Sequence, residues 1–235
     1  GKAFATLSAL KKAKVDFAIV DAQCYAATRG WTLLANGTIG GRASRGWALY
    51  SRLSGGMPAL QGKKLAYVKM GCRDKDFVFN AMLDSEVSEK HFGGLVGKPS
   101  LTGAVAEVAS FKGAEAVFAP VGEAKGLNKV FDTAPVPGPA FVQVNGRLDK
   151  DVVNRVRNAV VSYGGGGAIS GFVAANDKPF DALRRSLSRR IKRFVFATPP
   201  FVRLDASDVI ETPKSIDEPG FTEVKQHFAE PPVRQ

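Results

Sequence analysis

Three apolar, strand-like runs, each followed by a short loop and a helix-like segment, constrain the fold of this chain most strongly. The runs cover residues 15–20, 64–68 and 115–119. Buried strands that alternate with helices are typical of α/β proteins, whose strands pair into a sheet covered by helices. Ligands of such sheets lie at the carboxyl ends of the strands, where helix starts offer free backbone N–H groups. The pattern therefore predicts an α/β fold with a ligand-binding cleft.

Size and composition are typical of globular proteins. The 235 residues are enough for one large domain or for two lobes of about 100 residues each. Hydrophobic residues make up 45% of the chain, and no run approaches the roughly 20 consecutive apolar residues of a membrane-spanning helix. We therefore expect a soluble chain. No secretory signal precedes the helical pattern that begins near Phe4, which fits a processed chain as well as a cytosolic one.

The formal net charge of +11 favours an anionic ligand or partner, or it reflects only a well-solvated surface. Much of the excess lies in one helix-like stretch, residues 180–194, where Leu183, Leu187 and Ile191 form a single apolar stripe. Such a helix would dock on the body of the protein with its arginines in solvent. Because this arrangement explains the local charge, we expect no nucleic-acid partner.

Sequence signatures of catalysis, metal binding and cofactor binding are missing. The glycines at 164–167 follow a helical pattern rather than a strand and lack a Gly-Lys-Ser/Thr continuation, so they predict a helix end and not a phosphate loop. His91 and His227 have no neighbours at metal-ligand spacing. Two cysteines, Cys24 and Cys72, are too few for a disulfide scaffold. We therefore expect a protein that is not an enzyme, with no metal and no cofactor.

The loop after the second strand-like run contains the best candidate for an anion site. Gly71, Cys72 and Arg73 combine backbone N–H donors, a cation and a helix start. Asp74 and Asp76 beside them would instead cap the helix and occupy the same positive field. Ligand contact and plain capping use the same free N–H groups, so both interpretations stay open.

The loop after the first run contains two polar side chains that are placed to reach into a cleft. These are Gln23 and Tyr25. The alternative is that each packs or forms a hydrogen bond near the helix start, since a tyrosine hydroxyl needs a partner when it is buried. The sequence does not distinguish the two.

Three longer segments, taken in order, resemble the substrate-binding proteins of phosphate, phosphite and phosphonate ABC transporters. They are residues 14–20 (KVDFAIV) with Tyr25 beyond them, residues 60–68 (LQGKKLAYV) and residues 130–141 (VFDTAPVPGPAF). The resemblance runs from about residue 7 to about residue 163. It implies a type 2 periplasmic-binding-protein fold, in which two α/β lobes joined by hinge strands close on a tetrahedral oxyanion and deliver it to a membrane permease.

The resemblance also implies how the chain is divided. Each lobe would be a mixed sheet flanked by helices. Residues 1–48 and 143–235 would form the first lobe, with C-terminal helices and an extended tail, and residues 49–142 the second. The first lobe would be incomplete at its N-terminal end, because family members begin with a strand and a helix, whereas this chain starts at a point that matches a later helix.

The cleft between the lobes would hold the ligand. The residues that the loops and the resemblance together assign to it are Gln23, Tyr25, Gly71, Cys72, Arg73, Val121 and Glu123. The implied function is that of a periplasmic or other extracytoplasmic solute-binding protein for a small oxyanion such as phosphate or a phosphonate. Its partner would be an ABC permease, and the membrane would be reached only through this partner or through an N-terminal anchor missing from the sequence.

The loop at residues 69–74 departs from the family, because it has a thiol, an arginine and acids where serine and threonine are usual. Without those hydroxyls, hydrogen-bond donors for a phosphonate are lost. An alternative function is therefore a binding-protein fold reused as a sensory or structural component of a larger assembly. The resemblance places Cys24 and Cys72 on opposite walls of the cleft, where a disulfide would lock the lobes, but isolated cysteines are by default free thiols and we expect free thiols here.

Overall fold

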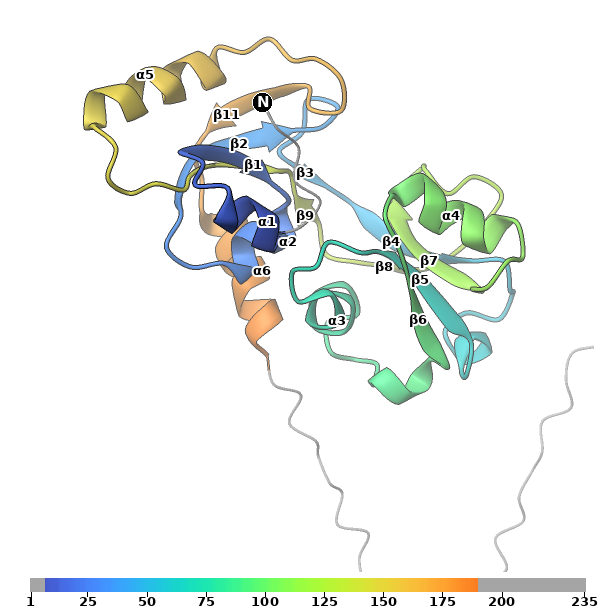
Figure 1. Cartoon of the computed structure of the whole chain (residues 1–235). Helices are drawn as coiled ribbons and strands as arrows, with labels where there is room; N and C mark the ends of the chain where they lie inside the picture. The colour runs from blue at the N-terminus through green and yellow to red at the C-terminus, as the bar shows by residue number, and fades with distance from the viewer. Residues whose placement is uncertain (1–6, 190–235) are drawn as a thin grey trace, which may run out of the picture. The chain divides into compact units, whose positions relative to one another are not determined.

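Two β-sheets joined by a short strand pair form the body of the protein in the computed structural model, which describes residues 7–189 (Figure 1). We call the part built on the first sheet lobe 1 and the part built on the second sheet lobe 2. The strands of lobe 1 are β1 (Phe17–Val20), β2 (Thr32–Thr38), β10 (Ala140–Gln143) and β11 (Gly171–Ala174). The strands of lobe 2 are β4 (Trp47–Ser51), β5 (Lys64–Val68), β6 (Gly94–Lys98), β7 (Ala116–Pro120) and β8 (Asn128–Asp132).

The chain passes from lobe 1 to lobe 2 through β3 (Ser44–Arg45) and returns through β9 (Val136–Pro137), and these two strands pair with each other. The helices that belong to lobe 1 are α1 (Leu7–Lys12), α2 (Ala22–Ala27), α5 (Lys150–Val161) and α6 (Lys178–Ser188). Those of lobe 2 are α3 (Asp74–Asp76), the π-helix η2 (Phe77–Met82) that continues it, α4 (Leu101–Ala109) and the short 3-10 turns η1 (Pro58–Leu60) and η3 (Glu89–His91).

Neighbouring strands of lobe 1 are antiparallel throughout, in the order β1-β10-β2-β11. β1 and β2 run in the same direction, as a strand–helix–strand pattern predicts. However, β10 returns from lobe 2 and inserts between them, so each adjacent pair is antiparallel. This sheet therefore differs from the mixed sheet that we expected for this lobe.

The sheet of lobe 2 is mixed, as expected, in the order β6-β5-β7-β4-β8. β5 is parallel to β6 and β7, whereas β4 is antiparallel to β7 and β8. Side chains of β7 alternate between two cores: Phe118 packs on the η2 side, and Val117 on the α4 side. Burial on both faces explains why this strand is an unbroken apolar run in the sequence.

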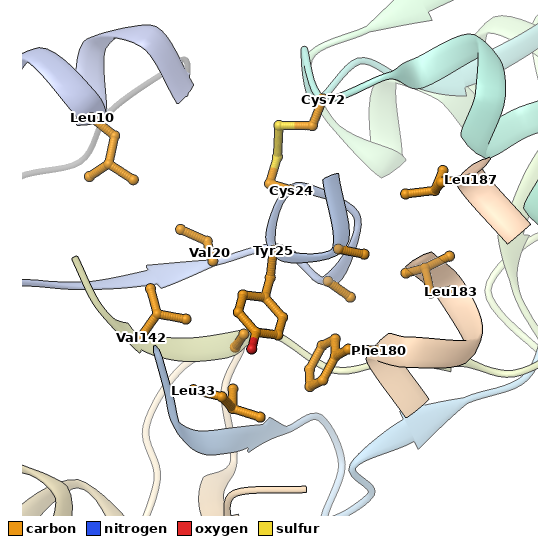
Figure 2. Packing of buried hydrophobic residues seen from close by; sticks show 13 residues of the cluster. Leu10, Val20, Cys24, Tyr25, Leu33, Cys72, Val142, Phe180, Leu183 and Leu187 are labelled. Carbon is orange, nitrogen blue, oxygen red and sulfur yellow. A yellow bond between two sulfur atoms is a disulfide. The ribbon is translucent and has the colours of Figure 1, made fainter. Parts of the chain in front are cut away.

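The core of lobe 1 is built between the sheet and the helices α2 and α6 (Figure 2). The ring of Tyr25 in α2 meets the ring of Phe180 in α6 edge to face, with centroids 4.9 Å apart. Leu183 and Leu187 lie buried on the same side of α6, so the predicted stripe is confirmed for these two leucines. The third member of the stripe, Ile191, lies outside the described residues. Each such buried side chain stabilises the fold by about 1.5–3 kcal/mol.

Two glycines allow the backbone segments to approach closely where the chain returns to lobe 1. The Gly37 N–H donates to the Pro139 carbonyl oxygen at 2.6 Å, and a Cβ on Gly138 would overlap the Gly37 carbonyl oxygen. Only glycine fits this contact. Gly37 therefore belongs to strand β2. The turn, which a glycine-rich stretch usually indicates, comes after it, between Ile39 and Arg42.

The expected division of the chain runs close to the line between the two sheets. Residue 48 falls within β4 and residue 143 within β10, so each expected boundary lies inside a strand, a few residues from the β3–β9 pair. The division, like the incompleteness of lobe 1, stays a prediction.

The predicted end of a helix before residue 164 is confirmed by α5, whereas the expected tail lies outside the described residues. Within residues 7–189, no helix is long and apolar enough to cross a membrane.

Candidate functional site

A cavity with a volume of about 130 Å³ lies between the two lobes. The start of α2 forms its wall on the side of lobe 1, while the end of β5 and the helix η2 contribute to its wall on the side of lobe 2. The lining is mainly apolar and aromatic. Its polar and aromatic side chains include Asp21, Gln23, Arg45, Trp47, Tyr67, Phe77 and Phe118.

Arg45 supplies the positive charge of the cavity lining. It lies on β3, at the crossover between the lobes, and its guanidinium forms an ion pair with the Glu123 carboxylate from the loop after β7. The side chains of Arg45 and Glu123 are 25% and 42% exposed, so water reaches both partners. An ion pair at this exposure is weak enough for another anion to compete with Glu123.

Asp21 is the acidic group of the lining and immediately precedes α2. As a whole residue, Asp21 is exposed to solvent. The protein atoms around its carboxyl group nevertheless displace part of the surrounding water, and this desolvation raises the pKa of Asp21 above the usual value. A hydrogen bond from its own backbone N–H acts in the opposite direction and is the smaller effect. The Asp21 carboxyl group therefore loses its proton less readily than a fully solvated aspartate.

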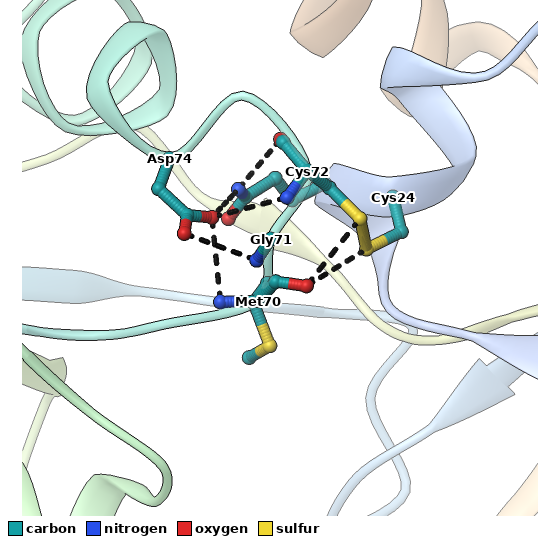
Figure 3. The surroundings of a disulfide bond; sticks show 6 residues. Cys24, Met70, Gly71, Cys72 and Asp74 are labelled. Carbon is teal, nitrogen blue, oxygen red and sulfur yellow. Dashed lines mark hydrogen bonds between the residues drawn. A yellow bond between two sulfur atoms is a disulfide. The ribbon is translucent and has the colours of Figure 1, made fainter. Parts of the chain in front are cut away.

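The carboxylate of Asp74 fills the anion position in the loop after β5 (Figure 3). Its Oδ1 accepts hydrogen bonds from the N–H groups of Met70 and Cys72, both at 3.3 Å, and its Oδ2 accepts one from Gly71 at 3.0 Å. The chain's own acid thus satisfies the loop donors that a ligand would use, although the helix start itself has no side-chain cap. The Gln23 amide of lobe 1 also donates to Asp74 Oδ1 at 2.6 Å and to the Cys72 carbonyl oxygen at 2.7 Å.

Cys24 and Cys72 form a disulfide, and the expectation of free thiols is wrong (Figure 3). Cys24 lies in α2 of lobe 1 and Cys72 in the loop before α3 of lobe 2, with Cα atoms 5.0 Å apart. The two are 48 positions apart in the sequence, and only the folding of the chain brings them into the range that a disulfide can bridge. Both cysteines are buried.

Of the seven predicted site residues, only Gln23 belongs to the cavity lining, and three of the others are held elsewhere or face solvent. The Tyr25 hydroxyl donates to Asp177 Oδ1 at 3.0 Å, and burial together with this carboxylate raises the tyrosine pKa to about 12. Arg73 donates from Nε to Asp76 and from Nη2 to the Leu187 carbonyl oxygen, both at 2.8 Å. Val121 is 56% exposed.

The structure therefore brings part of the predicted set together. Gln23 lines the cavity, Gly71 and Cys72 surround Asp74 beside it, and Glu123 reaches it through its ion pair. Their roles in ligand binding stay predictions. Sequence reasoning missed Arg45, because it stands in a stretch of glycine and serine without any hydrophobic period, and it missed Trp47, which follows directly after that stretch.

Among residues 7–189, no three His, Cys, Asp or Glu side chains are grouped so that they could hold a metal ion. His91 is half-buried, and its Nε2 lies 3.0 Å from the Met57 carbonyl oxygen. His227 lies outside the described residues.

Comparison with solved structures identifies the architecture. XAC2383 from Xanthomonas citri, solved bound to ATP, is similar with a TM-score of 0.61 and 14% sequence identity, over 77% of this chain and 80% of that one. The binding-protein component of an ABC phosphonate transporter from Pseudomonas aeruginosa is similar with a TM-score of 0.58 and 14% identity, over 76% and 70% of the two chains. The chain has the two-lobed type 2 periplasmic-binding-protein fold. No protein-family model and no curated protein matches the sequence.

The type 2 fold explains the position of the cavity. In this protein, the two lobes meet where β3 and β9 cross, and the cavity is lined from both lobes and from this crossover. At 14% identity the likeness extends to the fold alone. The function depends on the residues of the cavity.

Proposed function

We propose that this chain is an extracytoplasmic, non-catalytic solute-binding protein that holds a small oxyanion in the cavity between its lobes. The observation that carries the proposal is the interlobe position of this cavity, with the guanidinium of Arg45 at its wall. Guanidinium groups recognise carboxylate and phosphate oxygens with paired hydrogen bonds. The similar protein from P. aeruginosa is the binding component of a phosphonate transporter, which adds support for an anion of this class.

The size and lining of the cavity support a compact ligand. A cavity of about 150 Å³ in another protein holds one benzene molecule, and the volume here is about 130 Å³. Phosphate or a short alkylphosphonate is of that size. The aromatic walls formed by Trp47, Phe77 and Phe118 would contact a carbon substituent, while Arg45 would receive the charged oxygens.

The disulfide supports an extracytoplasmic location, because disulfides persist in oxidising compartments such as the periplasm and are rare in the cytosol. A solute-binding protein in that location would pass its ligand to a membrane permease, and we propose an ABC permease as the partner. The net charge of +11 would favour the approach of an anionic solute.

Isothermal titration with phosphate, phosphite and methylphosphonate tests the proposal, and tetramethylammonium serves as the probe of opposite charge. The Arg45→Met variant should bind the anion at least tenfold more weakly, because the anion would lose its positively charged partner in the cavity. Arg42→Met is the matched control, since Arg42 is an exposed arginine in the preceding turn and outside the lining. Absence of anion binding by both oxidised and reduced protein would refute the proposal.

One observation favours a second candidate function, a binding-protein fold reused as a sensory or structural component of a larger assembly. The backbone donors of residues 70–72 are already satisfied by Asp74, so this wall of the cleft has little to offer a free anion. Affinity purification of the tagged protein from its native membrane and soluble fractions tests this candidate. A stoichiometric partner that is not a permease would support it, and recovery of a partner-free monomer would count against it.

A further inference from the structure

The Cys24–Cys72 disulfide joins the two lobes (Figure 3). Cys24 directly follows Gln23, and Cys72 is two residues from Met70, and both of these neighbours line the cavity. Within residues 7–189, the backbone itself passes between the lobes only at the crossovers that contain β3 and β9. The disulfide is therefore a third covalent connection, formed next to residues of both cavity walls.

The disulfide limits how far these walls can separate. The Cα atoms of the two cysteines are 5.0 Å apart, and disulfides span at most about 6.8 Å between Cα atoms. While the bond is intact, the walls can therefore move apart at this point by no more than about 2 Å. A water molecule is about 2.8 Å across, so no solute can pass between the lobes at the position of the disulfide.

The other contacts between the walls are reversible. Gln23 donates to Asp74 and to the Cys72 carbonyl oxygen. On lobe 2, Arg73 and Asn80 donate to the carbonyl oxygens of Leu187 and Arg189, at the end of α6. Hydrogen bonds of this kind exchange with water, and none of them sets a fixed limit on separation as a covalent bond does.

We infer that the Cys24–Cys72 disulfide is a redox-sensitive latch, which keeps the lobes closed over the cavity until the bond is reduced. The inference rests on the proposed function in one respect, because it treats the cavity as a solute site. The reductant is a dithiol: one thiolate attacks a cysteine sulfur and breaks the S–S bond, and the second thiol then displaces the mixed disulfide. The protein gains two electrons and two protons as two thiols, and the dithiol becomes a cyclic disulfide.

Quenching of Trp47 fluorescence by acrylamide measures the opening directly, without knowledge of the solute. The chain has two tryptophans, Trp31 and Trp47, and Trp47 lines the cavity. In a Trp31→Phe background, Trp47 is the sole reporter. We expect the Stern–Volmer constant to rise at least twofold when dithiothreitol reduces the disulfide, with thiols counted by mass spectrometry in both states.

The double variant Cys24→Ser/Cys72→Ser should show the higher constant with and without dithiothreitol. Ala27→Ser, on the same helix as Cys24 but outside the disulfide, should keep the response of the parent protein. If the double variant fails to fold by circular dichroism, reduction of the parent protein still provides the measurement. Equal quenching of the oxidised and reduced protein, with the thiol count confirming reduction, would overturn the latch.

The same samples separate the latch from the proposed function. Stopped-flow mixing with methylphosphonate reports how fast the solute enters. Entry at least tenfold faster in the reduced protein supports both proposals. A redox response of Trp47 without binding of any anion leaves the latch standing and refutes the oxyanion function, whereas equal rates of anion entry in both redox states refute the latch alone.

Discussion

At the scale of single residues, Tyr25 shows how a side chain chosen for a ligand site can belong to the core instead. Its hydroxyl donates to Asp177, and its ring packs on Phe180. A tyrosine after a strand end is compatible with both roles, and the sequence left both open. The partner that decides the matter, Asp177, is 152 positions away in the sequence.

Replacement of Tyr25 by phenylalanine should change how stability depends on pH. The tyrosine pKa is raised from 10.0 to about 12 in the folded protein, so the folded state keeps its proton where the unfolded state has lost it. Stability from this group is therefore complete below pH 10 and is lost as the pH rises towards 12. Urea unfolding at a series of alkaline pH values should show a shallower loss for Tyr25→Phe, which should also cost about 1 kcal/mol at pH 7.

Tyr163→Phe is the control for this measurement, because Tyr163 is 48% exposed and lies outside the core. It should follow the alkaline curve of the parent protein. If Tyr25→Phe loses stability between pH 10 and 12 as steeply as the parent, the hydroxyl of Tyr25 does not cause the loss.

Glu123 is expected to act as a competitor of the ligand at Arg45. A partly exposed ion pair is worth about 0.2–1 kcal/mol, so its removal in Glu123→Gln should raise the affinity for the bound anion by roughly 1.4- to 5-fold. Titration calorimetry at constant ionic strength measures the change. Asp132→Asn is the matched control, because Asp132 pairs with Lys129 on β8 and lies outside the cavity lining. A fall in affinity in Glu123→Gln would instead make Glu123 a direct ligand contact.

At the scale of secondary structure, α5 combines a side-chain N-cap with only partial burial. None of its residues is buried, and it rests on β2 and β11 through half-buried valines such as Val153 and Val156. Its N-cap is strong, because Asp149 Oδ1 accepts from the N–H groups of Asp151 at 2.8 Å and of Val152 at 3.4 Å.

Asp149→Ala should therefore cost about 1 kcal/mol, and the cost should appear first as local opening of α5. Amide hydrogen exchange of residues 150–161 measures this opening. Asp151→Ala is the control, because Asp151 provides a charge in the first turn without capping it, and its loss should cost only about 0.3–1 kcal/mol. Equal loss of protection in both variants would show that charge, and not the cap, stabilises the helix.

The elements that the sequence predicted best are those whose burial is decided locally. The apolar run at 115–119 became β7 because both of its faces are covered, and Leu183 and Leu187 mark the buried face of α6. Pairing was not predictable in this way. The place of β10 between β1 and β2 depends on where the chain returns from lobe 2, and no local pattern encodes that return.

At the scale of the whole molecule, the site combines residues from five separate parts of the chain. Gln23 was predicted from its place after a strand, but Arg45 and the disulfide depend on how the two lobes face each other. Cysteine spacing in the sequence contains no sign of such a pair, because a loop of any length can close once the lobes meet.

The disulfide should also contribute to global stability. A cross-link between positions 48 residues apart removes conformational entropy from the unfolded chain worth about 4 kcal/mol. We therefore expect Cys24→Ser/Cys72→Ser to lose up to about 4 kcal/mol of unfolding free energy. Urea titration of the variant and of the parent protein, each with and without dithiothreitol, measures the difference. If the urea midpoint of the double variant still changed with dithiothreitol, the stability difference would have a cause other than the disulfide.

The insertion of β10 between β1 and β2 also sets an order for synthesis. β2 ends at residue 38 and β10 begins at residue 140, and all of lobe 2 lies between them in the chain. As the chain emerges from its N-terminus, during synthesis or export, the strands of lobe 2 appear as one continuous segment, whereas β1 and β2 have to wait for their common neighbour. The first lobe is thus the part of the protein whose earliest strands stay unpaired longest, and we expect it to be the part that most needs protection from aggregation.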